Sequence, residues 1–115
     1  MVRRSYTAVL EKNLVLTRRF ETEPYEVPWA SEARFFVRVL DPPGCSLLLR
    51  AQISPDGLTW CDECPEPVAT GGVALFSFAL RDFGHWLRLQ CEIVPPEVPV
   101  SRSQARVMIY LALKE

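Results

Sequence analysis

Two of the four cysteines, Cys61 and Cys64, have the Cys-x-x-Cys spacing that supplies half of a tetrahedral zinc site. A full site needs two more ligands, and the sequence holds neither a second such pair nor a histidine pair. A redox role of the thioredoxin kind would place the pair at the start of a helix in a βαβ unit, and neither feature is predicted here. We therefore expect no metal and no other cofactor, with Cys61 and Cys64 as the only metal candidates. Unligated or locally oxidised thiols are the expected state.

The sequence also lacks the groupings that acid–base or nucleophilic catalysis requires. His85 is the sole histidine, with Asp82 near it in the sequence, but no nucleophile motif such as Gly-x-Ser-x-Gly occurs. Phosphate-binding glycine motifs are missing as well. The carboxylates Asp62, Glu63 and Glu66 lie in a proline-rich stretch, which indicates a solvated acidic loop rather than a glycosidase pair. We expect a protein that is not an enzyme.

The clearest local structure is a turn in the middle of the chain. Proline fixes φ at its first corner, Asp56 suits the second, and Gly57 accepts the left-handed conformation that completes a tight hairpin. Apolar alternation enters through residues 45–53 and leaves through residues 58–62, which are predicted to be the two arms. The predicted structural turn consists of Ser54, Pro55, Asp56 and Gly57.

Period-two alternation of apolar residues recurs along the rest of the chain, with turn residues at short spacing. A helix over residues 5–20 is the competing interpretation, but β-branched residues and a poor 3.6-residue period disfavour it. Residues 21–30 contain two prolines and are expected to lie over the core as an irregular edge segment. We predict a single all-β domain, residues 1–115, with residues 1–30 as a partly extended N-terminal arm. Its fold is expected to be an antiparallel, jelly-roll-like β-sandwich of about eight strands, at residues 5–10, 14–17, 33–39, 45–53, 58–62, 73–80, 87–93 and 105–113.

Composition narrows the choice of partners. The chain is 49% hydrophobic and 23% charged with a formal net charge of −1, so no global charge attracts it to nucleic acid or to an anionic membrane. No apolar run reaches the length of a membrane helix, and the Arg3-Arg4 pair is not followed by the apolar segment of an export signal. We expect synthesis in the cytoplasm without a signal peptide, and protein partners rather than nucleic acid or membrane.

The side chains that alternate with the apolar stripes are unusual for a solvated surface. They mix arginine with aromatic residues and methionine, the types that protein–protein interfaces enrich. Cover by residues 1–30 would explain them without a partner. Self-association or docking on a larger assembly is the alternative, and single-stranded nucleic acid would be a third occupant. The candidate interface residues are Arg34, Phe36, Arg38, Trp86, Arg88, Arg106, Met108 and Tyr110.

Residues 25–114 resemble small β-sandwich proteins of bacteriophages and phage-derived particles. The resemblance is carried by the strand entry at residues 29–32, the leucine-rich strand ending in Ser54-Pro55-Asp56-Gly57-Leu58-Thr59-Trp60, and the Gly84-His85-Trp86-Leu87-Arg88 strand. The hairpin is also similar to that of discoidin-type modules and to the Asp-box of sialidase propellers, where it is a structural turn. The proline-rich residues 94–100 depart from the tighter turn expected in phage relatives.

The resemblance implies a structural or accessory subunit of a phage-like particle or another multi-subunit assembly, located in the virion or particle and acting as a homo-oligomer or within a larger complex. The alternative function is a carbohydrate- or ligand-binding module. In that module, loop aromatics such as Trp29, Trp60 or Phe83 would be the stacking platforms.

Overall fold

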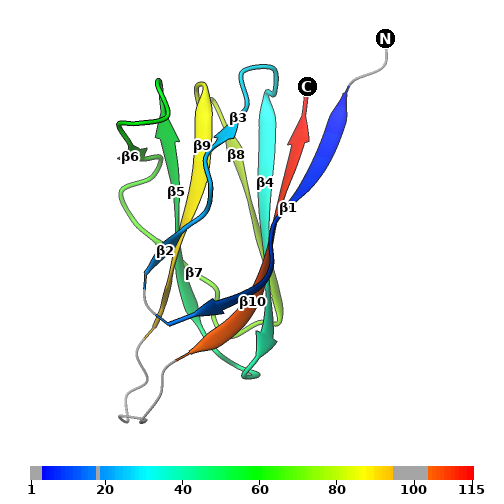
Figure 1. Ribbon diagram of the computed structural model, residues 1–115, viewed down its shortest axis with the longest axis vertical. Helices are drawn as coiled ribbons and strands as arrows, with labels where there is room; N and C mark the ends of the chain where they lie inside the picture. The colour runs from blue at the N-terminus through cyan, green and yellow to red at the C-terminus, as the bar shows by residue number, and fades with distance from the viewer. Residues whose placement is uncertain (1–3, 18, 95–103) are drawn as a thin grey trace.

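The computed structural model describes residues 4–17, 19–94 and 104–115, and all secondary structure in these ranges is β. Two antiparallel sheets pack face to face: sheet A has the order β1-β10-β4-β8, and sheet B has the order β2-β9-β5-β6, with β3 also paired to β9 and β7 to β5 (Figure 1). The strands are β1 (Ser5–Leu16), β2 (Phe20–Glu21), β3 (Tyr25–Glu26), β4 (Glu32–Asp41), β5 (Leu47–Ser54), β6 (Cys61–Asp62), β7 (Val68–Ala69), β8 (Leu75–Arg81), β9 (Trp86–Ile93) and β10 (Ala105–Lys114).

The strand order is that of a jelly roll. The short strands β2 and β3 both pair with β9, and β6 and β7 both pair with β5, so each pair occupies one strand position. Counted this way, eight strand positions are divided between two four-stranded sheets, with orders 1-8-3-6 and 2-7-4-5. The predicted fold class, an antiparallel jelly-roll-like sandwich, is confirmed. Ten strands are observed instead of about eight, because the two strands predicted within residues 5–17 are one strand, β1, and because the short strands β2, β3 and β7 lie in segments predicted to be irregular.

The core lies between the sheets and follows the predicted alternation. Phe35 and Val37 of β4 are fully buried, as are Leu87 and Leu89 of β9. On β10 every second side chain from position 105 to position 113 is buried, while the residues between them are partly or fully exposed. Cys91 is buried as expected, and burial raises the pKa of its thiol to about 12. Alternation therefore identifies the buried side of each long strand correctly.

The N-terminal segment departs from the prediction of two strands joined by a turn. Residues 5–16 form one strand, β1, that pairs with β10 along its whole length. The polar stretch at residues 11–13 is accommodated by register shifts on either side of Glu11 instead of by a turn. Such bulges bend a strand without ending it, and β1 bends sharply in its middle (Figure 1). Residues 20–26 then pair with β9 at the edge of sheet B.

The hairpin after β5 is wider than predicted. Only Cys61 and Asp62 of the expected second arm pair with β5, and Leu58 is 85% exposed. The physical reason is that the Asp56 carboxylate binds the backbone N–H groups of Leu58 and Thr59, which removes them from the ladder. Residues 55–60 thus form a loop. The predicted loop at residues 64–72 contains the short strand β7, and residues 95–100 of the predicted proline-rich loop lie outside the described residues.

Two buried threonines complete the interrupted strand positions. The Thr22 backbone N–H donates to the Leu89 carbonyl at 2.9 Å, and the Leu89 N–H donates to Thr22 Oγ1 at 3.0 Å. Thr70 makes the same two bonds with Leu47, each at 2.9 Å. Each threonine hydroxyl therefore replaces the carbonyl of a strand residue and satisfies a buried N–H group on a central strand.

We expect Thr22→Val to lower the free energy of unfolding by about 1–3 kcal/mol, because the buried Leu89 N–H would lose its acceptor. Thr22→Ser keeps the oxygen and is expected to cost distinctly less. Urea denaturation followed by tryptophan fluorescence measures both values. Equal losses for the two variants would contradict the role given to the hydroxyl.

Candidate functional site

The outward side of sheet A is an aromatic and arginine-rich surface, which we call the A face. Across its middle, Val9, Tyr110, Phe36 and Ser77 stand in one row of neighbouring strands. The next row places Met108, Arg38 and Leu75 side by side. Val9 is 54% exposed and Leu75 is 56% exposed. The A face consists of Thr7, Val9, Glu32, Arg34, Phe36, Arg38, Asp41, Leu75, Ser77, Ala79, Arg81, Arg106, Met108, Tyr110, Ala112 and Lys114.

The outward side of sheet B, the B face, has a different chemistry. Its side chains bind one another: Arg88 Nε donates to Gln52 Oε1 at 2.7 Å, and Gln52 Nε2 donates to Asp62 Oδ1 at 2.9 Å. Gln90 donates to Glu21 at 3.1 Å. The B face consists of Glu21, Glu26, Leu48, Arg50, Gln52, Asp62, Ala69, Trp86, Arg88, Gln90 and Glu92. Polar side chains here largely bind within the chain.

The eight candidate interface residues divide between the two faces. Trp86 and Arg88 lie on the B face, where the Arg88 guanidinium stacks over the Trp60 ring at 4.3 Å and a Cβ at Gly57 would lie 3.1 Å from the Trp86 ring. Both therefore hold the loop of residues 55–60 against sheet B. The other six stand together on the two central strands of sheet A: Arg34, Phe36, Arg38, Arg106, Met108 and Tyr110.

The predicted structural turn is held by two side chains. Ser54 Oγ accepts from the backbone N–H groups of Asp56 at 3.2 Å and Gly57 at 2.8 Å. Asp56 Oδ1 accepts from the N–H groups of Leu58 and Thr59, both at 2.8 Å. These bonds to the ionised form lower the pKa of Asp56 to about 2. Gly57 has φ of 78°, a left-handed conformation that leaves room for the Trp86 ring beneath it.

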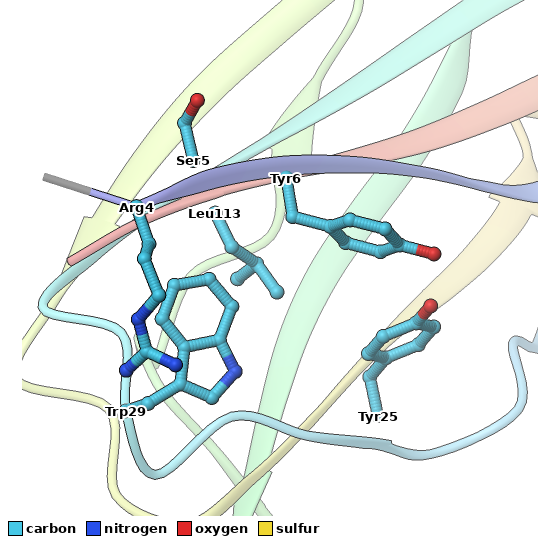
Figure 2. A pocket seen from close by; sticks show the side chains of 6 residues that line it. All are labelled: Arg4, Ser5, Tyr6, Tyr25, Trp29 and Leu113. Atoms are coloured by element: carbon cyan, nitrogen blue, oxygen red, sulfur yellow. The ribbon is translucent and has the colours of Figure 1, made fainter.

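A groove of about 530 Å³ lies where the start of β1 faces the segment around β3. The Arg4 guanidinium lies over the Trp29 ring at 4.8 Å, and Arg4 Nε also binds Glu115 Oε2 at 2.6 Å. Figure 2 shows the hydroxyl groups of Tyr6 and Tyr25 pointing toward one another across the groove. A side-chain hydrogen bond with Tyr6 that favours the protonated form, together with burial, raises the pKa of Tyr25. The groove thus offers three aromatic rings to a ligand.

The remaining candidates do not assemble into a reactive centre. Cys61 and Cys64 are both exposed, and within the described ranges no group of three or more His, Cys, Asp or Glu side chains could hold a metal ion. His85 Nε2 lies 3.2 Å from Glu26 Oε2, on the surface. Phe83 is 2% exposed, so the prediction of Phe83 as a stacking platform is wrong. Among the residues that the structure describes, there is no helix long and apolar enough to cross a membrane.

Solved structures share this architecture. The PBSX exported protein XepA superposes with a TM-score of 0.69 at 11% identity, over 94% of this chain and 36% of XepA. The SPBc2 prophage-derived protein YomS has a TM-score of 0.56 at 8% identity, over 100% of this chain and 96% of YomS. A chain of the Triatoma virus empty capsid has a TM-score of 0.57 at 10% identity, over 94% and 87% of the two chains. The fold is shared with prophage and viral proteins.

That likeness confirms the predicted resemblance to phage β-sandwich proteins at the level of the fold. The chain spans about a third of the length of XepA. No family model matches the sequence. No curated protein sequence matches it either. At identities of 8–11% these structures show a shared fold only, so a function has to be argued from the chemistry of the surface.

Sequence reasoning missed the groove and the full extent of the A face. Tyr6 lies on β1 of sheet A and Tyr25 on β3 of sheet B, so they come together only through the packing of the two sheets. No local sequence pattern predicts that packing. Leu75 and Val9 join the A face through strand pairings that alternation alone does not specify. The signal available in the sequence was the mixed composition of the outward positions, which selected β4 and β10 of sheet A together with β9 of sheet B.

The Asp56 carboxylate makes the loop sensitive to acid. Its folded pKa of about 2 lies below its ordinary value of 3.8, so the stability that it contributes is present above about pH 5 and is lost as the pH falls toward 2. We expect Asp56→Ala to lower the melting temperature at pH 7, and the difference from wild type to vanish near pH 2. Carbon-detected NMR titration of the carboxyl group measures the pKa directly, and a midpoint near 3.8 would contradict the bonding described.

Proposed function

We propose that this protein is a non-enzymatic structural or accessory subunit of a phage-like particle or another multi-subunit assembly, and that it binds its neighbour through the A face. The observation that carries this proposal is the row of Val9, Tyr110 and Phe36 beside Met108, Arg38 and Leu75 on the outward side of sheet A. Half-buried aromatic side chains beside exposed aliphatic ones, flanked by arginines, are what a desolvated protein contact uses.

The contrast between the two faces supports this assignment. Both faces carry side chains that bond within the chain, such as Arg88 with Gln52 on the B face and Arg34 with Ser77 on the A face, but the B face is the more polar of the two. On the A face, Val9 and Leu75 leave more than half of their surfaces in water. Burial of such apolar surface is favourable by about 25 cal/mol per Å². The free-energy gain available to a partner is therefore larger on the A face.

Intramolecular cover by residues 1–30 is the alternative explanation of the A face. In the described part of that segment, β1 lies beside β10 in the plane of sheet A, and β2 and β3 pair with β9 in sheet B. These pairings add strands at the edges of the sheets. They leave the outward side chains of β4 and β10 without a covering layer from residues 5–16 or 20–26.

The binding mechanism follows from the residue types. Phe36, Tyr110 and Met108 would be the central anchors, because the aromatic rings bury much area with few rotatable bonds and the flexible methionine side chain adapts to an irregular partner surface. Arg38 and Arg106 would bind carboxylates of the partner in bidentate fashion at the rim. The fold shared with prophage proteins and with a viral capsid protein is in keeping with a role in a particle.

We expect Tyr110→Ser to weaken incorporation into the native assembly about tenfold or more, since truncation of a central aromatic anchor typically costs that much. Leu58→Ser, an apolar position that is 85% exposed in the loop of residues 55–60 and lies outside both faces, is the matched control and should be incorporated as wild type. Quantitative mass spectrometry of assemblies purified from cells that express each tagged variant measures the ratio.

If wild type is found in no assembly and stays monomeric at high concentration, the proposal is wrong. Equal incorporation of Tyr110→Ser and Leu58→Ser would also overturn it, because the contact would then not use the A face. Circular dichroism of both variants verifies that the sandwich is intact before the comparison is made.

The groove favours a second candidate function, a carbohydrate-binding module. Tyr6, Tyr25 and Trp29 line it, and aromatic rings are the platforms on which sugar rings stack. We expect Trp29→Ala to reduce any glycan affinity about tenfold, while Trp60→Ala, on a ring stacked by Arg88 outside the groove, leaves it unchanged. A glycan array followed by calorimetry tests this, and the absence of binding on the array would exclude the candidate.

A further inference from the structure

We propose that the A face of one copy binds the B face of a second copy, so that the protein associates head to tail. This inference rests on the proposed function, because it names the occupant of the A face. The two faces lie on opposite sides of the same sandwich and differ in charge and composition. A contact between unlike faces leaves one face of each kind exposed at the ends, so copies add repeatedly to form a ring or a filament.

Charge complementarity is the first support. The A face carries five basic side chains, on Arg34, Arg38, Arg81, Arg106 and Lys114, against the two acidic ones of Glu32 and Asp41. The B face carries four acidic side chains, on Glu21, Glu26, Asp62 and Glu92, against the two basic ones of Arg50 and Arg88. The chain as a whole has a net charge of only −1, so its opposite charges are separated onto two sides.

This separation argues against a symmetric contact of two A faces. In such a dimer each basic surface would meet an identical basic surface, and like charges opposed across an interface are costly. The acidic B face offers the opposite arrangement. Glu21 is the cross-strand neighbour of Gln90, and Glu92 lies two residues from Gln90 on β9, so both carboxylates stand on the outward side of sheet B, where arginine side chains of a facing sheet would meet them.

The size of the faces is adequate for a reversible contact. Four strands about 4.8 Å apart, each with about eight residues rising 3.3 Å, give a flat area of about 500 Å² per face. Two such faces bury about 1,000 Å², the lower limit for a specific interface. Association is therefore expected to be weak, concentration-dependent and sensitive to salt.

Pairing through the edge of β1 is the competing route to self-association. Among the described residues the outer edge of β1 has no partner strand in sheet A, but two register shifts and Lys12 interrupt it. Bulges and an inserted lysine are the devices that prevent strand addition at an exposed edge. On the A face the register shift between Arg106 and Val107 lies at the start of β10 and leaves the rows of Tyr110 and Met108 regular, which favours contact between faces over contact between edges.

The experiment uses two double variants of the full chain. Arg38→Glu with Arg106→Glu reverses charge on the A face, and Glu21→Lys with Glu92→Lys reverses it on the B face. Glu66→Lys, in the loop before β7, is the charge-reversal control outside both faces. Sedimentation velocity of each protein over a range of concentrations, alone and in equimolar mixtures, gives the oligomer distribution. Thermal unfolding verifies that every variant is folded.

Wild type and the control are expected to form species larger than a dimer at high concentration. Their association should weaken from 0.1 M to 1 M salt, as the screening length falls from about 10 Å to about 3 Å. Each double variant alone should associate about tenfold or more weakly. Their mixture should regain species of dimer size or larger, because each supplies the intact face that the other lacks.

Other outcomes separate this inference from the proposed function. If the B-face variant still dimerises alone and mixing restores nothing, the contact joins two A faces and the head-to-tail arrangement is wrong, while the proposed function stands. If wild type is monomeric at every concentration, the head-to-tail contact is also wrong, and incorporation of Tyr110→Ser into the native assembly still decides the proposed function.

Discussion

The alternation of side chains along β10 is the constraint on which the rest of this structure depends. β10 lies between β1 and β4, and its buried residues at every second position pack against sheet B. Because a shift by one residue would exchange every inward side chain for an outward one, burial of Val107, Ile109 and Leu111 fixes Met108 and Tyr110 on the A face. The register of β10 therefore determines both which of its residues enter the core and which belong to the candidate interface.

In sheet B the outer strand positions consist of short strands, while the two central strands keep the same alternation of inward and outward side chains. The strands β9 and β5 are long and regular, whereas their neighbours are two-residue pieces separated by prolines and polar residues. At these gaps the backbone N–H groups of Leu89 and Leu47 have no strand carbonyl as acceptor and bind the hydroxyl groups of Thr22 and Thr70 instead. In the loop after β5, the side chains of Ser54 and Asp56 accept the backbone N–H groups. Side chains thereby do locally what continuous strands do in sheet A.

Alternation made the fold class, the long strands and their buried sides predictable from the sequence. It failed where a side chain competes with the ladder: Asp56 draws Leu58 and Thr59 away from β5, and the stretch around Glu11 bends β1 instead of ending it. Strand pairing could not be predicted from alternation, because alternation shows which side of a strand faces inward and not which strands lie beside it. The candidate set therefore joined residues of both sheets, and the groove between Tyr6 and Tyr25 was not foreseen.

This distinction bears on how outward aromatic and arginine residues should be interpreted. Trp86 and Arg88 have the same composition signal as Phe36 and Arg38, yet their surroundings differ. Arg88 is stacked on Trp60 and bonded to Gln52, so its charge and planar face already have partners within the chain. Phe36 has Tyr110 and Ser77 as lateral neighbours in its row. An outward residue that secures its own loop is already engaged, and the set that stands in a row across sheet A is the one for which we propose a contact with another surface.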